Sequence, residues 1–402
     1  MDADASPSAS PHAPPPHDAS PRVAFLVSTF NRRDVLLQTL RALAGTTVPS
    51  QIFVVDNAST DGTADAVRAA FPAVHLLAQR ENRGACAKNL ALPLITAPFT
   101  VFLDDDSFPQ PGSVEKMLAH FEADPSLGAA IFTITLPSGA QECSAYPDVF
   151  IGCGTGFRTD ALRQVGGLPD DFFMQAEEYD LSLRLLDAGW KIRRFGDLHA
   201  THLKSPAARL PSRTMRLDVR NNLTLIGRYF PDEWVLPFAR DWIARYRLIA
   251  LANGATPAFY RGLVEGAARL IRAADRRPVK PQTFEQFARV TQIEQRLAQA
   301  VRDQALKRIL LVDLGKNVTP YWRAAHRLGL RIQAIADARL GGRGFTWRGV
   351  DILPDADALD LPFDAAIISN SSPVHARQRS DAWQSLTGRP VVDLLQSPQS
   401  PT

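Results

Sequence analysis

The stretch that decides the fold is VAFLVSTFNR at residues 23–32, where an apolar run of strand type passes directly into polar residues. Similar apolar runs follow along the chain, and helix-like stretches separate them. The runs cover 52–56, 74–77 and 99–103, and the helical stretches lie around 33–44, 63–70 and 84–92. This alternation predicts an α/β fold with a doubly wound, mainly parallel sheet.

Polar residues stand directly after three of these strands, at 29–32, 56–59 and 104–106. In a doubly wound sheet, ligands bind beyond the carboxyl ends of the strands. The sequence therefore predicts a ligand site that is built from these three segments.

Changes in composition divide the chain. The predicted parts are a disordered Pro/Ser/Ala-rich tail at 1–21, the α/β domain at 22–206, a helical extension at 207–306, a small Rossmann-like α/β domain at 307–396 and a frayed end at 397–402. The loop after the first strand of the small domain lacks the G-x-G-x-x-G spacing of a dinucleotide site. An accessory or oligomerisation role is therefore favoured for this domain, and a chain that ends near 306 is expected to retain activity.

Composition also narrows the class of function. The net charge of +3 arises from 45 basic and 42 acidic residues spread along the chain, which argues against a nucleic-acid-binding surface. The three cysteines form no C-x-x-C pair, so neither disulfides nor a zinc site is expected. No apolar run reaches the length of about 18 residues that a membrane span needs. A cytoplasmic protein is predicted, and peripheral contact with the inner face of the membrane is left open.

Three carboxylates in succession, Asp104, Asp105 and Asp106, end an apolar strand. Like charges repel unless a cation neutralises them, and Mg²⁺ or Mn²⁺ takes one or two carboxylates together with substrate phosphates. The triplet therefore indicates a metal site for a diphosphate leaving group. The alternative is a solvated acidic turn that caps the helix starting near Gly112.

A second acidic cluster, Glu177, Glu178 and Asp180, opens an amphipathic helix. Acids in a first turn complement the helix dipole, but a carboxylate aimed into a cleft also suits a general base. Further on, His199 and His202 follow a strand-like run, and an imidazole is a good third ligand for a divalent ion. His202 is favoured for that role over an ordinary core or surface histidine.

An ordered series of motifs resembles the family 2 glycosyltransferases of GT-A fold, over about residues 23–206. The motifs are STFNR at 28–32, VVDNASTDGT at 54–63, ENRGACAKN at 81–89, LDDD at 103–106, GTGFR at 154–158, VGGLP at 165–169 followed by FF at 172–173, and EEYDL at 177–181. The order of the series, more than any one motif, makes a chance match improbable.

The resemblance implies roles for individual residues. Asp56 would contact the nucleotide base, Asp104 the ribose or metal, and Asp106 the metal beside the diphosphate. The other residues implied on the nucleotide-sugar side are Thr29, Asn31, Arg32, Asn82, Gly84, Lys88 and Asp105, and those on the acceptor side are Gly154, Gly156 and Phe157.

In the catalytic cluster, Glu178 stands where the family usually has Asp, so Glu177 remains a rival base and Asp180 a weaker one. Lys88 stands where the family commonly has Arg, which keeps the charge and loses the bidentate geometry. For Asp61, an ordinary turn or N-cap explains the residue equally well.

The resulting hypothesis is an inverting transfer of sugar from a nucleotide-sugar donor to the hydroxyl of a saccharide or glycolipid acceptor, in the synthesis of surface polysaccharide or glycoconjugate. Two alternatives stay open. One is a nucleotidyltransferase that makes nucleotide sugars, although its Gly-rich basic N-terminal loop is absent at 28–32. The other is a non-catalytic module that binds nucleotide sugars. Assembly into a homo-oligomer is also left open.

Overall fold

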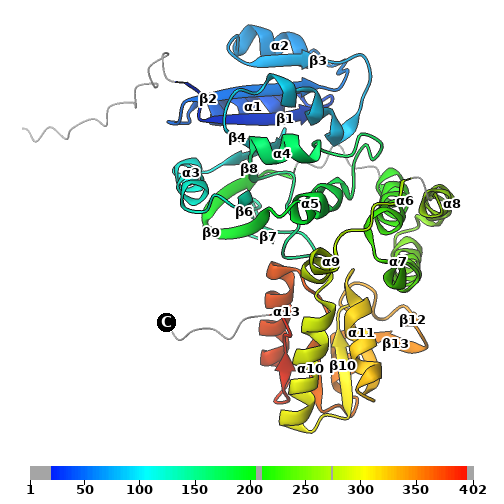
Figure 1. Ribbon diagram of the computed structural model, residues 1–402. Coiled ribbons are helices and arrows are strands. Elements are labelled where there is room, and N and C mark those ends of the chain that lie inside the picture. The colour runs from blue at the N-terminus through cyan, green and yellow to red at the C-terminus, as the bar shows by residue number, and fades with distance from the viewer. Residues whose placement is uncertain (1–19, 205–210, 273–274, 396–402) are drawn as a thin grey trace, which may run out of the picture.

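The structure is a computed structural model, and it describes residues 20–204, 211–272 and 275–395. The frayed end predicted at 397–402 and nearly all of the tail predicted at 1–21 lie outside these ranges. Figure 1 shows two sheets, one from each half of the chain, with a group of helices beside them.

The first sheet has the strand order β3-β2-β1-β4-β8-β6-β9-β5, with β7 paired to β6. Its parallel half consists of β1 (Val23–Thr29), β2 (Ser50–Asp56), β3 (His75–Ala78) and β4 (Phe99–Asp104). The mixed half consists of β5 (Ser107–Pro109), β6 (Leu127–Thr135), β7 (Gln141–Glu142), β8 (Thr155–Arg158) and β9 (Lys191–His202). The four strands predicted from the sequence form the parallel half.

Alternate residues of each strand face opposite layers of helices, as the period of two requires. Ala24 and Leu26 of β1 pack on one side with residues of η1 (Gly84–Leu90), α4 (Thr159–Val165) and α5 (Glu177–Asp187). Phe25 and Val27 pack on the other side. The helices on that side are α1 (Arg33–Ala44), α2 (Thr63–Ala70) and α3 (Ser113–Ala123). The predicted doubly wound arrangement is thus confirmed, although 84–92 forms 3₁₀ turns, η1 and then η2 (Leu92–Leu94), in place of an α-helix.

The helical region consists of α6 (Pro211–Tyr229), α7 (Asp232–Ala252), α8 (Thr256–Leu270), α9 (Pro281–Ala288) and α10 (Val290–Gln304). Its core is aromatic: Phe230 is in edge contact with Phe238, Trp242 and Phe284. The sequence predicts a break at Pro237, but this residue lies inside α7. At that position the helix lacks the hydrogen bond that a backbone N–H would donate.

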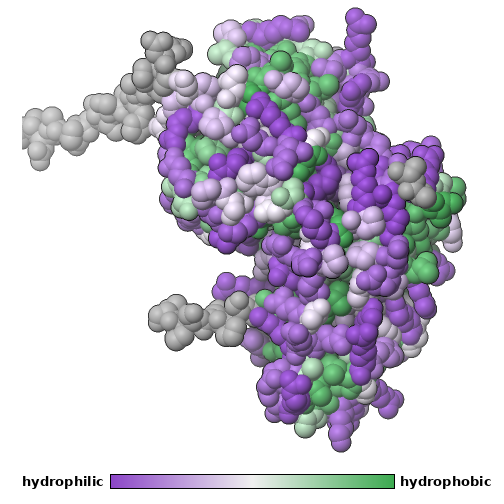
Figure 2. Space-filling model, viewed as in Figure 1, coloured by the Kyte–Doolittle hydropathy of each residue, from purple (hydrophilic) through white to green (hydrophobic). Residues whose placement is uncertain are grey.

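Apolar side chains of this region also reach the surface, where green atoms gather over α8 in Figure 2. Tyr260 and Val264 of α8 are exposed, as is Ile271 directly after it. Within the described residues, no helix combines the length and the apolar character that crossing a membrane requires.

The second sheet has the order β12-β13-β11-β10-β14-β15 and is parallel except where β12 meets β13. The strands are β10 (Arg308–Val312), β11 (Arg331–Ala336), β12 (Thr346–Trp347), β13 (Val350–Leu353), β14 (Ala365–Ile368) and β15 (Val391–Val392). The helices are α11 (Val318–Arg327), α12 (Asp355–Leu359) and α13 (Pro373–Leu386). This is the small Rossmann-like α/β unit that the sequence predicts, with the short strands β12 and β13 in addition.

The carboxyl edge of the second sheet faces the rest of the protein. In the loop after β10, the Lys316 carbonyl accepts a 2.6 Å hydrogen bond from Trp242 Nε1. In the loop after β14, Ser371 Oγ donates to the Ala145 carbonyl at 3.0 Å. Asp337, at the end of β11, accepts bonds from backbone N–H groups of its own domain. The edge at which such a sheet would hold a nucleotide is therefore occupied by contacts within the chain.

Candidate active site

A cleft of about 680 Å³ opens at the carboxyl ends of β1 and β4. It is lined by the loop that follows β1, by the acidic triplet after β4, by segment 150–153 and by the start of α5. The sequence-predicted residues that line it are Thr29, Asn31, Arg32, Asn82, Gly84, Lys88, Asp104, Asp105, Asp106, Glu177, Glu178 and His202. Most of the predicted site is thus brought together around one cavity.

The three carboxylates of the acidic triplet have different surroundings. Asp105 is buried, and its carboxylate accepts hydrogen bonds from Thr29 Oγ1 at 2.8 Å and Arg32 Nη1 at 2.5 Å. Burial raises the pKa of Asp105 to about 7, although the charge of Arg32 acts in the opposite direction. Because both oxygens are engaged inside the protein, Asp105 anchors the loop after β1. The alternative of a solvated turn does not describe Asp105 and Asp106, which are 4% and 2% exposed.

Asp106 stands between two cations. Arg32 Nη2 donates to Asp106 Oδ2 at 2.7 Å, and His202 Nε2 lies 3.2 Å from Asp106 Oδ1. Burial alone would raise the pKa of Asp106, but the hydrogen bonds from His202 and Arg32 hold it well below its usual range. Asp106 is therefore an anion at neutral pH.

The pairing of β5 with β9 brings His202 to the triplet across 96 residues of sequence, because the register sets Ser107 opposite His202. The other ring nitrogen, Nδ1, lies 2.6 Å from Glu142 Oε2. Burial acts to lower the pKa of His202, but its contacts with Asp106, Cys153 and Glu142 raise it to about 12. Glu142 fixes the orientation of the ring and aims Nε2 at the triplet.

Oxygen and nitrogen atoms of Asp104, Asp106 and His202 lie within 4.8 Å of one another, close enough to hold one metal ion. A second group, Glu142, Cys153 and His202, meets the same distance limit. Burial raises the pKa of the Cys153 thiol to about 11, however, so it stays protonated and is a poor ligand for a hard ion. The first group has the carboxylate oxygens that Mg²⁺ and Mn²⁺ prefer. Glu142 supports His202 through a contact with its other ring nitrogen, Nδ1.

Lys88 adds a buried positive charge beside the acids. The side chain is 2% exposed, and its Nζ lies 3.8 Å from Asp104 Oδ1 and 3.1 Å from Ser28 Oγ. A compact ammonium in this position can meet both the aspartate and an incoming phosphate.

Glu177 and Glu178 enter the cleft from the first turn of α5. Burial raises the pKa of both carboxyls, and for Glu177 the charge of Glu178 adds to the effect. Glu177 Oε2 is buried without a hydrogen-bond partner among the described residues. Glu178 faces Gly152, where an added Cβ would lie 3.6 Å from Glu178 Oε1. Burial thus favours the protonated form of both carboxyls more than in an exposed glutamate.

Lys316 of the second domain contacts this helix at Tyr179. Its Nζ lies 3.7 Å from the centre of the Tyr179 ring and 4.9 Å from that of Trp242. Burial lowers the pKa of Lys316 to about 7, against the attraction of Asp218 and Glu178. The positive charge of Lys316 in turn acts to lower the pKa of Glu178.

Three residues other than glycine adopt the left-handed backbone conformation directly before α5. They are Phe173, Gln175 and Ala176, with φ of 69°, 71° and 65°. Asn221 of α6 stabilises this backbone, because its Nδ2 lies 3.1, 2.9 and 2.7 Å from the carbonyl oxygens of residues 172, 174 and 175. On the opposite side, Gly84 passes so close that a Cβ there would lie 2.2 Å from the Phe173 oxygen. The start of α5 is thus held from both sides.

We expect Asn221→Ala to lower the free energy of unfolding by about 1–3 kcal/mol, because it leaves buried carbonyl oxygens without a donor. Urea denaturation followed by circular dichroism measures the change. Asn253→Ala, which removes an exposed side-chain bond to the Ile249 carbonyl, is the matched control. A loss no larger than that of the control would show that the amide does not hold the segment.

Five of the predicted residues lie outside the cleft lining. Asp56 is buried and accepts the N–H of Ser59, so it shapes the turn after β2. Asp180 accepts hydrogen bonds from Arg184 Nε at 2.7 Å and Tyr229 Oη at 2.8 Å, and it braces α5 against α6.

The other three are the predicted acceptor-side residues Gly154, Gly156 and Phe157, which lie in or next to β8. Phe157 packs against Phe102 in the core. Their neighbours Gly152 and Cys153 line the cleft instead. Asp61 accepts the N–H of Thr63, the first residue of α2, as its turn-like context suggests.

Sequence reasoning missed Glu142, Arg213, Asn221 and Lys316. Glu142 and Arg213 line the cleft, and the other two support α5 from α6 and from the second domain. None lies within a motif, and each reaches the site through contacts between distant segments. The sequence carries no local signal that would have found them.

Comparison with known proteins agrees with this geometry. Residues 24–139 match the family described as glycosyl transferase family 2. This match covers β1 to β6 and includes the acidic triplet. The resemblance predicted from the sequence is confirmed over residues 24–139, the part of the chain that matches this family.

Two curated relatives extend the comparison. Glycosyltransferase AglE of Haloferax volcanii is 22% identical over 254 residues, which make up 58% of this chain and 79% of that protein. Succinoglycan biosynthesis protein ExoU of Rhizobium meliloti is 29% identical over 101 residues, 24% of this chain and 30% of ExoU. The match with ExoU thus spans less than one third of that protein.

Among solved structures, the mannosyltransferase PcManGT from Pyrobaculum calidifontis, in complex with GDP-Man and Mn²⁺, has a TM-score of 0.43 and 20% identity. The alignment covers 79% of this chain and 89% of PcManGT.

Proposed function

We propose that this protein transfers a sugar from a nucleotide-sugar donor to an acceptor hydroxyl with inversion at the anomeric carbon. The observation that carries the proposal is the composition of the cleft. One wall presents Asp104, Asp106 and His202, and another presents Glu177 and Glu178 within the same cavity of about 680 Å³. The first group suits a metal-bound diphosphate, and the second suits removal of a proton from an acceptor.

The donor would lie along the carboxyl ends of the parallel strands. Asn57 and Asn82 line this part of the cleft and shape the glycine loop, since Asn82 Oδ1 accepts the Gly84 N–H and Asn57 Nδ2 donates to the Gly84 carbonyl. Lys88 lies next to Asp104 and can contact a phosphate of the donor. The nucleotide and its diphosphate are therefore assigned to this side.

Asp104, Asp106 and His202 would hold Mg²⁺ or Mn²⁺. When bound, such an ion offsets the negative charge that grows on the departing diphosphate. As a metal ligand, His202 would be neutral, with Nε2 free of its proton and Nδ1–H hydrogen-bonded to Glu142.

Glu178 would accept the proton of the acceptor hydroxyl as the acceptor oxygen attacks the anomeric carbon. Attack from the face opposite the diphosphate is a single displacement, and inversion follows. Glu178 is partly exposed to the cleft, whereas Glu177 is 7% exposed, which favours Glu178 as the carboxylate that meets the acceptor. The raised pKa makes the conjugate acid easier to form.

The acceptor is proposed to be a saccharide or glycolipid in polysaccharide or glycoconjugate synthesis. The name of ExoU, a succinoglycan biosynthesis protein, supports this class. Phe150 and Gly152 line the cleft, and Gly152 lies next to Glu178, so the acceptor is proposed to bind on this side.

Incubation with a panel of nucleotide sugars and Mn²⁺ or Mg²⁺ tests the proposal. We expect slow release of nucleoside diphosphate in water and faster release with a saccharide acceptor. Release of pyrophosphate from a nucleoside triphosphate and a sugar phosphate would identify a nucleotidyltransferase instead. Binding of nucleotide sugar without turnover on any acceptor would identify a binding module.

A further inference from the structure

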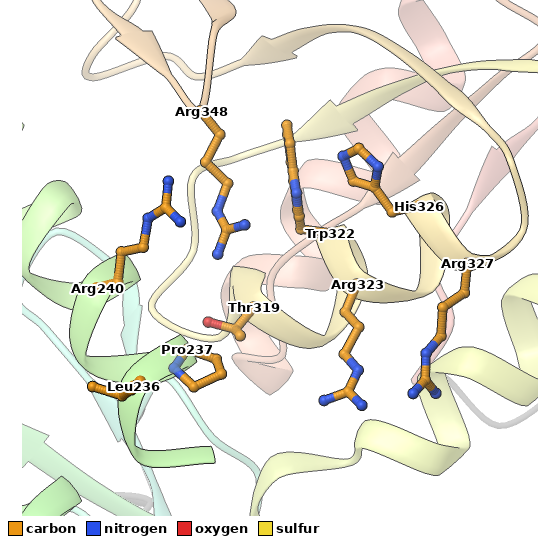
Figure 3. Close-up of a pocket in the computed structure, with 9 residues that line it drawn as sticks. All are labelled: Leu236, Pro237, Arg240, Thr319, Trp322, Arg323, His326, Arg327 and Arg348. Carbon is orange, nitrogen blue, oxygen red and sulfur yellow. The ribbon is translucent and has the colours of Figure 1, made fainter. Parts of the chain in front are cut away.

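A second cavity, of about 550 Å³, lies where α7 and α11 meet the turn between β12 and β13 (Figure 3). It is bounded by the helical region on one side and by the second domain on the other. It shares no lining residue with the donor cleft. Neither the family resemblance nor the proposed transfer reaction accounts for it.

The cavity is lined along one face of α11. The contributing residues follow the spacing i, i+3, i+4, i+7 and i+8, which places them on one stripe of a helix. They are Thr319, Trp322, Arg323, His326 and Arg327. From the facing side, α7 contributes Arg240 together with the apolar residues Leu236 and Pro237.

Four arginines surround this cavity, and two of them are neutralised by the protein. Arg348 donates from Nε and Nη2 to Asp241 Oδ1 at 2.9 and 2.7 Å. Asp241 is buried, and its other oxygen accepts Thr319 Oγ1 at 2.8 Å. Arg327 lies 2.8 Å from Glu294 Oε2.

The other two, Arg240 and Arg323, have no carboxylate oxygen within 4.0 Å among the residues that the structure describes. Arg323 is partly buried over the Trp234 ring, at 4.3 Å from its centre. Burial, with the charge of Arg327, lowers the pKa of Arg323. Figure 3 shows Arg240 and Arg348 extending into the space above Thr319. The cavity thus holds positive charge that no side chain of the described residues neutralises by contact.

We propose that this cavity binds a phosphate-bearing anion. Guanidinium groups match phosphate oxygens in charge and in planar geometry. Arg240 and Arg348 extend into one space of this cavity, and Arg323 adds positive charge at its other end (Figure 3). The apolar surface of Leu236, Pro237 and Trp322 then suits the organic part of a phosphate ester. Two sources share this chemistry, a free phosphate ester and the headgroup of an anionic phospholipid.

The test compares the full-length protein with Arg240→Gln/Arg323→Gln. The control, Arg302→Gln/Arg377→Gln, removes the same charge from exposed positions of α10 and α13. Calorimetric titration with pyrophosphate in EDTA probes the free anion, because chelation removes the ion on which the donor cleft is proposed to depend. Sedimentation with phosphatidylglycerol and phosphatidylcholine vesicles probes the headgroup.

We expect the Arg240→Gln/Arg323→Gln protein to bind at least about tenfold more weakly than wild type, because the cavity loses the two arginines that no carboxylate of the described residues contacts, while the control binds as wild type does. Loss confined to pyrophosphate identifies a free phosphate ester, and loss confined to phosphatidylglycerol vesicles identifies a headgroup. Equal loss in both variants, unchanged binding in the first, or no binding of either probe by the wild type would overturn the proposal. Arg240→Gln alone, at an exposed position, serves if the double variant does not fold.

Discussion

Replacing Glu178 by Gln is expected to slow sugar transfer by about 10²–10⁴-fold while donor binding persists, because a general base contributes roughly that factor. The amide keeps the size of the side chain and loses the ability to accept the proton. Single-turnover transfer gives the rate of the chemical step, and calorimetry with the nucleoside diphosphate gives the donor affinity. A decrease confined to the rate assigns the base.

Glu177→Gln is the control for this experiment, because the two side chains are adjacent in sequence and point about 100° apart on the helix. A rate near wild type for Glu178→Gln together with an inactive Glu177→Gln would move the base to Glu177. The pH dependence gives a second readout. Burial raises the pKa of Glu178, so activity should be lost on acidification at a higher pH than an ordinary glutamate would give.

Asp106→Asn is expected to weaken metal-dependent binding of nucleoside diphosphate by about a hundredfold or more, because a neutral amide replaces a charged ligand of a hard ion. Titration of the nucleotide with Mn²⁺, and again with EDTA, separates the metal-dependent part. Asp65→Asn, at an exposed position of α2, is the control. Equal Mn²⁺-dependent affinity in wild type and a folded Asp106→Asn protein would remove Asp106 from the metal site.

Because Asp106 is buried between Arg32 and His202, this variant also loses ion pairs of the fold. Asp104→Asn provides the complementary test, since the Asp104 side chain is 42% exposed and its nearest cation is 3.8 Å away. It should reproduce the loss of metal-dependent binding at little cost in thermal stability. Unchanged binding in this variant would exclude the metal group that contains Asp104.

The parallel half of the first sheet could be predicted because each of its strands is an apolar run with a polar residue at its end. The triplet and the acids of α5 could also be predicted, because clustered like charges repel one another unless a cation or a ligand balances them. What a linear pattern does not contain is the pairing of β5 with β9, which sets His202 beside Asp106. Asp56, predicted to contact the nucleotide base, and Asp180, predicted as a weaker base, lie outside the lining of the cleft, and each accepts hydrogen bonds within the fold.

Lys316 of the second domain lies against Tyr179 of α5, so sequence changes in the two domains are not independent. The loops at the carboxyl edge of the second sheet form contacts with segment 143–146 of the first domain and with Trp242 of the helical region. These contacts constrain the sequence on both sides. Mutations on one side of these contacts should be retained mainly with compensating changes on the other. The two halves of the chain are therefore expected to be inherited and exchanged as one unit, and a recombinant that joins halves from distant homologues would inherit a mismatched support for α5, the helix that carries the proposed base.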